Sequence, residues 1–147
     1  MLRILFFVLL SANPVLAGPD RISVLMGSHH ANPGQSFEEF NPGVFLEWRS
    51  GGRHSYSVGA YRNSYGRGTV AAGVNYPILQ RGAFQADIFA GAAHYPREGR
   101  TFAISAGDVV PMLGLRLRYR ALYLLTLPGD GKVADFVVGY GLSFPLQ

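Results

Sequence analysis

Near its C-terminal end the chain reads Phe136-Val137-Val138-Gly139-Tyr140-Gly141-Leu142-Ser143-Phe144. Successive side chains of a β-strand point to opposite faces, so every second residue of this stretch shares a face. One face would carry large apolar side chains, and the other would carry mostly small residues. In a soluble sandwich the apolar face would be the core, whereas in a barrel embedded in lipid it would be the outer surface. The alternation predicts a strand and leaves both architectures open.

Segments of strand length, separated by turn signals, fill the chain before this stretch. We expect about eight strands, at residues 21–30, 42–49, 54–63, 68–76, 83–95, 103–117, 120–127 and 134–144. The 19 glycines, 10 phenylalanines and 8 tyrosines suit strands and tight turns better than helices. The sequence therefore predicts an all-β protein, and eight is the smallest number of strands that is common in outer-membrane barrels.

Two features favour a membrane barrel over a soluble sandwich. Aromatic residues fall near the ends of the predicted strands, where membrane barrels carry their aromatic girdles; they are Trp48, Tyr76, Tyr119, Tyr140 and Phe144. The alternating strand that ends at Phe144 also resembles the C-terminal signal read by the outer-membrane assembly machinery, although the usual signal ends on the aromatic itself and here residues 145–147 follow. We therefore expect a small antiparallel up-and-down β-barrel in the cell outer membrane.

The interior of such a barrel would combine charge and apolar surface. Arg116, Arg118 and Arg120 alternate with apolar residues, and a barrel would place Arg116 in its lumen and the other two near a polar rim. Both faces of the segment 120–127 are apolar. In a narrow barrel its inner face would either pack as a core or hold an acyl chain. A water-filled pore is not expected, because about eight strands enclose too little space.

The N-terminus has the pattern of a cleavable export signal. Arg3 supplies the positive start, residues 5–10 form the apolar stretch, and Val15-Leu16-Ala17 is a small-residue cleavage site. The apolar run is shorter than the roughly 20 residues of a membrane-spanning helix, so a retained anchor is the second interpretation. We expect residues 1–17 to be a signal peptide and residues 18–147 to form one barrel domain.

The composition excludes several kinds of chemistry. The chain has no cysteine, which excludes disulfides, thiol catalysis and cysteine-based metal sites. The formal net charge is +4, and losing Arg3 would lower it by one, which is too little to indicate a nucleic-acid partner. His29 and His30 are adjacent on a predicted strand and would point to opposite faces, so they make a poor metal site. We expect no metal and no cofactor.

Three stretches carry a resemblance to a known family. The first runs from Val109-Val110-Pro111 to Thr126-Leu127-Pro128-Gly129, the second is Phe37-Glu38-Glu39 followed by Gly43, and the third is 61–65. They resemble, in that order, the Leu-Pro strand with its returning Ile-Pro-Gly strand, the Tyr-Asn-Glu segment, and the Lys-Asp-Ser-Trp segment of the lipid A palmitoyltransferase family. Members of this family are outer-membrane barrels that transfer a palmitoyl chain from a phospholipid to lipid A. The amphipathic helix that precedes the family's first strand has no counterpart here.

The resemblance implies an active site at the outer ends of the first and third strands. The family places a His on the first strand and an Asp-Ser pair at the end of the third. His30 would be that His, with His29 the alternative if the register slips, and Ser64 would be the Ser. Asn63 stands at the Asp position. In such a site His30 would accept the proton of Ser64, and Asn63 would hold the imidazole through its amide oxygen without supplying charge.

The resemblance also implies partners. Phospholipid and lipid A would be the substrates, and Arg62 and Arg67, which flank Ser64, could bind lipid A phosphates through charge-assisted hydrogen bonds. We expect the barrel to act as a monomer. Structural interpretations stand beside the catalytic ones: residues 62–67 also read as a polar turn with solvated charges, and the two histidines as a polar strand end.

Two other functions are weighed against acyl transfer. The first is a non-enzymatic outer-membrane barrel that binds lipid or modifies the cell surface. The second is a lipid A deacylase, another small barrel esterase. Deacylases of that type carry a His-x-Ser-Asn arrangement toward the C-terminal half, and this sequence has no such motif, which ranks the deacylase last.

Overall fold

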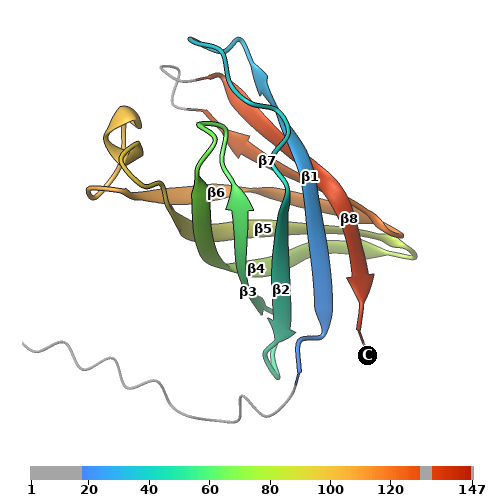
Figure 1. The fold of residues 1–147 in the computed structure, drawn as a ribbon. Coiled ribbons are helices and arrows are strands. Elements are labelled where there is room, and N and C mark those ends of the chain that lie inside the picture. Colours follow the sequence, from blue (N-terminus) through green and yellow to red (C-terminus); the bar gives the residue numbers. More distant parts are fainter. Residues whose placement is uncertain (1–17, 130–133, 147) are drawn as a thin grey trace, which may run out of the picture.

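The computed structural model describes residues 18–129 and 134–146, so the expected signal peptide lies outside the described residues. The described residues form eight strands and one short 3-10 helix, η1(Gly99–Thr101). The strands are β1(Arg21–Ala31), β2(Gly43–Arg49), β3(Ser55–Arg62), β4(Gly68–Arg81), β5(Phe84–His94), β6(Val109–Tyr119), β7(Leu122–Pro128) and β8(Phe136–Pro145). Each strand pairs with the next in an antiparallel manner, and β8 pairs with β1, so that the sheet closes (Figure 1). The predicted all-β antiparallel barrel is confirmed.

β8 shows the two faces that its sequence predicts. Phe136, Tyr140 and Phe144 are exposed on the outside of the barrel. The small residues of the other face are buried. At Gly141 the neighbouring strand comes so close that a Cβ would lie 2.0 Å from the carbonyl oxygen of Val24, so only glycine fits there. The apolar face of β8 is therefore an outer surface, and the closed barrel excludes the sandwich.

Many large apolar side chains are exposed and many polar side chains are buried, which is the reverse of the distribution in a soluble protein. Exposed large apolar residues occur on all eight described strands. The buried side chains include many polar groups, among them four charged residues in the lumen, which are Glu47, Asp87, Arg116 and Arg118. No helix among the described residues is long and apolar enough to cross a membrane.

The four buried charges form one network across the lumen. Arg116 lies 2.7 Å from a carboxylate oxygen of Glu47 and 2.6 Å from one of Asp87. Arg118 lies 3.1 Å from Glu47 and 3.5 Å from Asp87. Two positive and two negative charges thus compensate one another, as buried ions require. Arg118 lies one residue from the end of β6, near the rim as predicted, but this compensation keeps it buried, whereas Arg120 is exposed.

Two strand boundaries differ from the prediction by more than two residues. β4 continues past Pro77, because a register shift between Pro77 and Leu79 accommodates a residue that cannot donate to the ladder. β6 begins at Val109 and not at 103. The residues before it form a turn, in which Gly107 has a φ of 64° and the Asp108 carboxylate accepts the N–H of Arg97.

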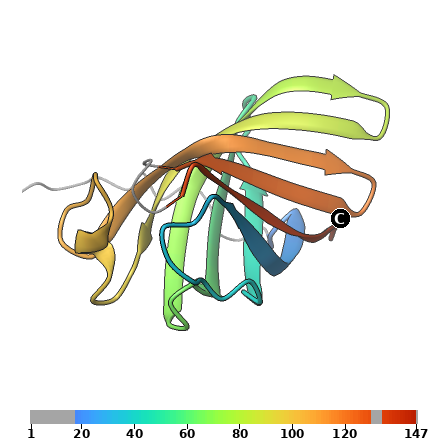
Figure 2. The ribbon, with the colours of Figure 1, turned by 90° about the horizontal axis from the view of Figure 1, so that it is seen from above.

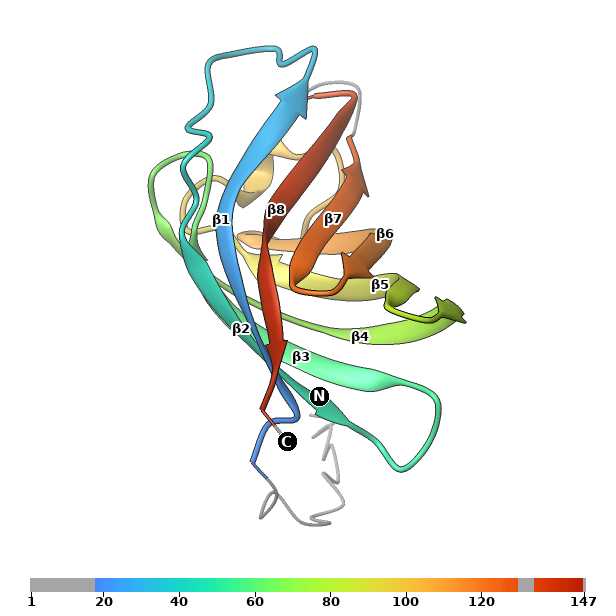
Figure 3. The same cartoon turned by 90° about the vertical axis from the view of Figure 1, so that its right-hand side faces the viewer.

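The two ends of the barrel differ. The long connections 32–42 and 95–108 lie at one end together with the turn 63–67, and we name this the loop end; the segment 32–42 rises above it in Figure 3. The opposite, hairpin end carries the short β4–β5 and β6–β7 turns, whose hairpins extend to the same side in Figure 2.

The wall of the barrel is incompletely paired toward the loop end. The described pairing of β1 with β2 runs only from Arg21 to Leu25. That of β6 with β7 runs only from Leu115 to Tyr119. Beyond these points the two pairs of strands share no described ladder, although the N–H of Ser28 donates to the carbonyl of Glu39 at 2.9 Å.

Candidate functional site

A shift in register on β1 selects which histidine enters the barrel. The shift lies between Leu25 and Gly27, opposite β8. The buried side chains of β1 are Ser23, Leu25, Ser28 and His30. The extra residue reverses the alternation, so His30 faces inward. His29 faces outward, its side chain 65% exposed and its Nδ1 2.8 Å from Glu39. The register alternative that the sequence left open is resolved in favour of His30.

The structure brings His30 and Ser64 together. Ser64 lies in the turn between β3 and β4, and its Oγ is 3.2 Å from the Nε2 of His30, a residue 34 positions earlier. This is a hydrogen-bond distance at which an imidazole can accept the proton of a hydroxyl. His30 is 7% exposed and Ser64 is half-buried. The two residues singled out in the sequence therefore lie at the distance that a serine nucleophile and its base would require.

Asn63 has a different task from the expected one. Its amide oxygen accepts the N–H groups of Tyr65 at 2.9 Å and Arg67 at 3.0 Å, and its amide nitrogen donates to Thr69 at 2.8 Å. Asparagine commonly closes a turn on its own backbone in this way. With these bonds made, Asn63 does not orient the imidazole. It shapes the turn that presents Ser64.

The imidazole of His30 is held by an aromatic ring. Its Nδ1 is buried and has no hydrogen-bond partner among the described residues. The ring stacks on Phe37, with 4.4 Å between centroids and 18° between planes. Phe37 in turn meets the edge of Tyr65. In the sequence, Phe37 belongs only to a stretch that resembles the family, and nothing there indicates that it stacks on His30. Stacking on Phe37 thus fixes the plane of the imidazole, and no carboxylate among the described residues bonds to its Nδ1.

Arg62 and Arg67 are both engaged in ion pairs. Arg62 lies 2.8 Å from the carboxylate of Glu38. Arg67 lies 2.9 Å from Glu98 and also donates to the carbonyl of Pro96 at 2.8 Å. These contacts tie the Ser64 turn to the two neighbouring loops, 32–42 and 95–108. The arginines hold the loop end together, and a lipid phosphate would have to compete with their carboxylates.

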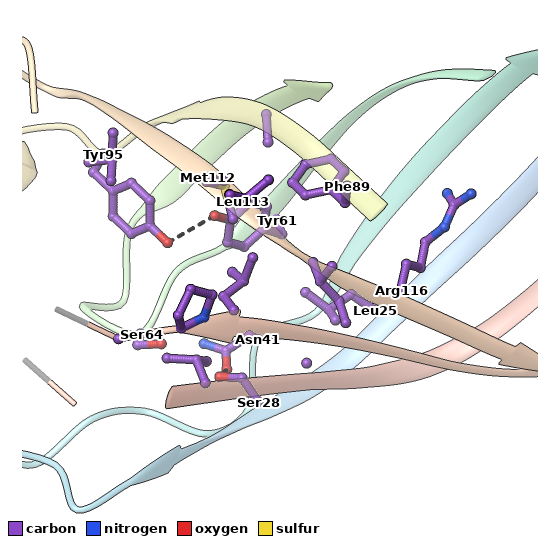
Figure 4. A pocket seen from close by; sticks show the side chains of 18 of the residues that line it. Leu25, Ser28, Asn41, Tyr61, Ser64, Phe89, Tyr95, Met112, Leu113 and Arg116 are labelled. Carbon is purple, nitrogen blue, oxygen red and sulfur yellow. Dashed lines mark hydrogen bonds between the residues drawn. The ribbon is translucent and has the colours of Figure 1, made fainter. Parts of the chain in front are cut away.

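A cavity of about 490 Å³ opens beside the dyad of His30 and Ser64 (Figure 4). Small-molecule sites span roughly 300–1,000 Å³, so it is large enough for a ligand. Its apolar lining includes Leu25, Phe45, Phe89, Tyr123, Leu125 and Leu127. The inner apolar face predicted for the segment 120–127 therefore borders open space. His30 and Ser64 line the cavity toward the loop end, and Arg116 lines it toward the charge network.

Aromatic side chains enclose the cavity near the loop end. The hydroxyl of Tyr61 donates to that of Tyr95 at 3.0 Å, as Figure 4 shows. Phe102, from the β5–β6 connection, packs on Tyr95 with 4.8 Å between centroids. Burial raises the pKa of Tyr95, so the phenol stays neutral. Aromatic rings thus line the cavity near His30 and Ser64 at the loop end.

No protein-family model matches the chain, and no curated protein matches its sequence. Among residues 18–129 and 134–146 no three His, Asp or Glu side chains gather where they could hold a metal ion. The geometry of the dyad and the cavity therefore has to carry the functional conclusion.

Proposed function

We propose that the protein is an outer-membrane acyltransferase that moves an acyl chain from a phospholipid to lipid A, as the lipid A palmitoyltransferases do. The observation that carries the proposal is the 3.2 Å contact between His30 Nε2 and Ser64 Oγ at the side of an apolar cavity. A lipid ester suits both the cavity and the His30–Ser64 pair, because its acyl chain is apolar and its carbonyl carbon can be attacked by a nucleophile.

The outer surface supports a location in lipid. Soluble monomers rarely expose contiguous apolar patches larger than a few hundred Å², whereas exposed apolar side chains here occur on every described strand. Tyr119 and Phe144 are exposed near strand ends, as an interfacial girdle requires, whereas Tyr76 and Tyr140 are exposed within β4 and β8. Trp48, the fifth expected member, is half-buried. Assembly of such a barrel would require the outer-membrane assembly machinery as a partner.

The incomplete wall supports the entry of lipid from the side. Where β1 and β2, or β6 and β7, share no described ladder, the strands can part without breaking a row of backbone hydrogen bonds. Both places lie toward the loop end, where the dyad is. A lipid in the outer leaflet would reach Ser64 through such a place with its acyl chain entering the apolar cavity.

The chemistry needs only the dyad and two lipids. Ser64 Oγ attacks the ester carbonyl carbon and passes its proton to His30 Nε2. The bond to the lysophospholipid oxygen then breaks, that oxygen takes the proton from His30, and the acyl chain stays on Ser64. A hydroxyl of lipid A next attacks the acyl carbon while His30 accepts its proton. Breaking the Ser64 ester returns that proton to the serine.

Mass spectrometry of lipid A tests the proposal. Lipid A from Gram-negative cells that make the protein should gain the mass of one acyl chain, and Ser64→Ala should abolish the gain. Ser50→Ala is the matched control, because Ser50 lies in the β2–β3 turn at the other end of the barrel. Unchanged lipid A, in cells where an active palmitoyltransferase modifies it, would remove the proposal.

The Nδ1 of His30, which has no partner among the described residues, favours a second candidate, a lipid-binding barrel without chemistry. Its cavity would then hold an acyl chain without cleaving the ester. Native mass spectrometry should find the same bound lipid in the unmodified protein and in Ser64→Ala, and every phenotype should survive that substitution.

A further inference from the structure

A buried amide beside the dyad has an unused hydrogen-bond donor. Asn41 lies just before β2 and is 2% exposed. Its amide oxygen accepts the hydroxyl of Ser28. Its amide nitrogen, Nδ2, is buried and has no partner within the described part of the chain. Asn41 lines the same cavity as His30 and Ser64.

An unpaired buried donor lowers stability, and most native proteins pair nearly all such groups. Three buried side-chain atoms of the described residues lack a partner, and they are His30 Nδ1, Asn41 Nδ2 and Asn75 Oδ1. The first belongs to the base itself. The third is an acceptor, which cannot stabilise negative charge. Asn41 Nδ2 is therefore the donor that a ligand group in the cavity could use.

The amide is held close to the reacting groups. Ser28 and His30 are two residues apart on the inner face of β1, which separates them by about 6.6 Å along the strand. Asn41 is bonded to Ser28, and Ser64 is bonded to His30. Figure 4 shows the amide nitrogen of Asn41 turned to the side of the cavity where Ser64 lies. Asn41 and Ser64 thus line the same side of the cavity.

We propose that Asn41 Nδ2 donates a hydrogen bond to the carbonyl oxygen of the ester that Ser64 attacks. This inference rests on the proposed function. As Ser64 Oγ adds to the carbonyl carbon, the electron pair of the C=O double bond moves to oxygen, and the hydroxyl proton moves to His30. A donor that is already in place stabilises this oxyanion more than it stabilises the neutral ester, which lowers the barrier. Ser28 is a positioning residue, because its hydroxyl bond orients the amide.

The test uses the purified full-length barrel in detergent micelles with p-nitrophenyl palmitate as the probe ester. The key variant is Ser28→Ala with Asn41→Leu, which replaces both members of a buried hydrogen bond by apolar groups and so spares the fold. We expect kcat to fall about 10²- to 10³-fold, the usual effect of losing one oxyanion donor, with KM nearly unchanged. Ser28→Ala alone should cause a smaller fall, because Nδ2 is retained but less well oriented.

A purely structural role for Asn41 makes the opposite prediction. The double variant would then keep its turnover, since no polar group is left unpaired, and wild-type kcat in a variant that melts like the parent overturns the inference. Asn41→Ala serves as a second variant if the double variant does not fold. Ser143→Ala, which removes a buried hydroxyl near the hairpin end, should leave turnover unchanged.

The thionoester of the same probe gives a readout that stability does not affect. Sulfur accepts hydrogen bonds weakly, so the unmodified protein should prefer the oxygen ester. That preference should shrink in Asn41→Ala. An equal preference in both proteins contradicts the inference.

Labelling with a fluorophosphonate distinguishes failure of the Asn41 inference from failure of the proposed function. Stoichiometric labelling of Ser64, together with an inactive Ser64→Ala, establishes the nucleophile; if Asn41 variants are then fully active, only the inference falls. If the unmodified protein neither labels at Ser64 nor turns over ester, both fall.

Discussion

The imidazole of His30 contacts the hydroxyl of Ser64 at the loop end, where β2 does not extend between β1 and β3. Gly43, the first residue of β2, pairs with Leu25 on one side and Tyr61 on the other. Beyond Gly43 no described strand separates the two, and the turn after β3 reaches His30 at 3.2 Å. The late start of β2 thus creates the site.

The two adjacent histidines provide a matched pair for testing the base. His30→Ala should reduce ester turnover by about 10²- to 10⁴-fold, the usual contribution of a general base. His29→Ala should leave it unchanged, because His29 faces outward and bonds to Glu39. Steady-state kinetics with p-nitrophenyl palmitate measures both. Equal losses would contradict the assignment of His30.

The register shift on β1 should be visible in chemical modification. Diethyl pyrocarbonate should react faster with His29, whose side chain is 65% exposed, than with His30, which is 7% exposed. Deleting Met26, the extra residue of the shift, should restore the plain alternation and keep this order, because Gly27 then follows Leu25 directly and His30 stays on the inner face. Peptide mass spectrometry over a reaction time course measures both rates. A reversed order in the deletion variant would show that Met26 is not the extra residue of the shift.

Phe37 should affect the rate more than the fold. Aromatic pairs contribute about 0.5–1.5 kcal/mol beyond their area, so Phe37→Leu should lower kcat roughly two- to tenfold as the imidazole loses its fixed orientation. Phe37→Tyr keeps the ring and should restore the rate. The kcat values of both variants are the measurement, with KM as the check that binding is unaffected. A full rate in Phe37→Leu would show that stacking does not orient His30.

Arg116 should dominate the stability of the lumen. Arg116→Met leaves Glu47 and Asp87 without their closest cation, and removing one partner of a buried ion pair costs about 3–5 kcal/mol. Arg49→Met, which removes an exposed pair with Asp20, should cost less than about 1 kcal/mol. Urea unfolding in detergent measures both free energies. Equal costs would mean that the luminal network does not stabilise the barrel.

Much of the candidate site follows from local sequence. The stretch containing Ser64 and the strand ending near His30 can be located from turn residues and alternation, because both signals depend on neighbouring residues alone. The bonds of Asn63 could not be predicted, since an asparagine can close its own turn or reach a distant ring. Its amide is committed only once the turn meets Thr69 on β4.

The proposed role of Asn41 is even harder to predict from the sequence than the bonds of Asn63. Nothing in the sequence of residues 32–42 distinguishes Asn41 from the other polar residues of this loop. Its role depends on contact with Ser28, and that contact depends on the shift that turns Ser28 and His30 inward.

The sequence by itself determined the strands and their two faces, as in the stretch from Phe136 to Phe144, because the direction of a side chain follows from a local period of two. The tertiary structure alone decided which face is outside, since this requires closure of β8 on β1. It also decided which histidine enters the lumen, because one extra residue opposite a partner strand reverses the alternation, and alternation within a single strand does not reveal it.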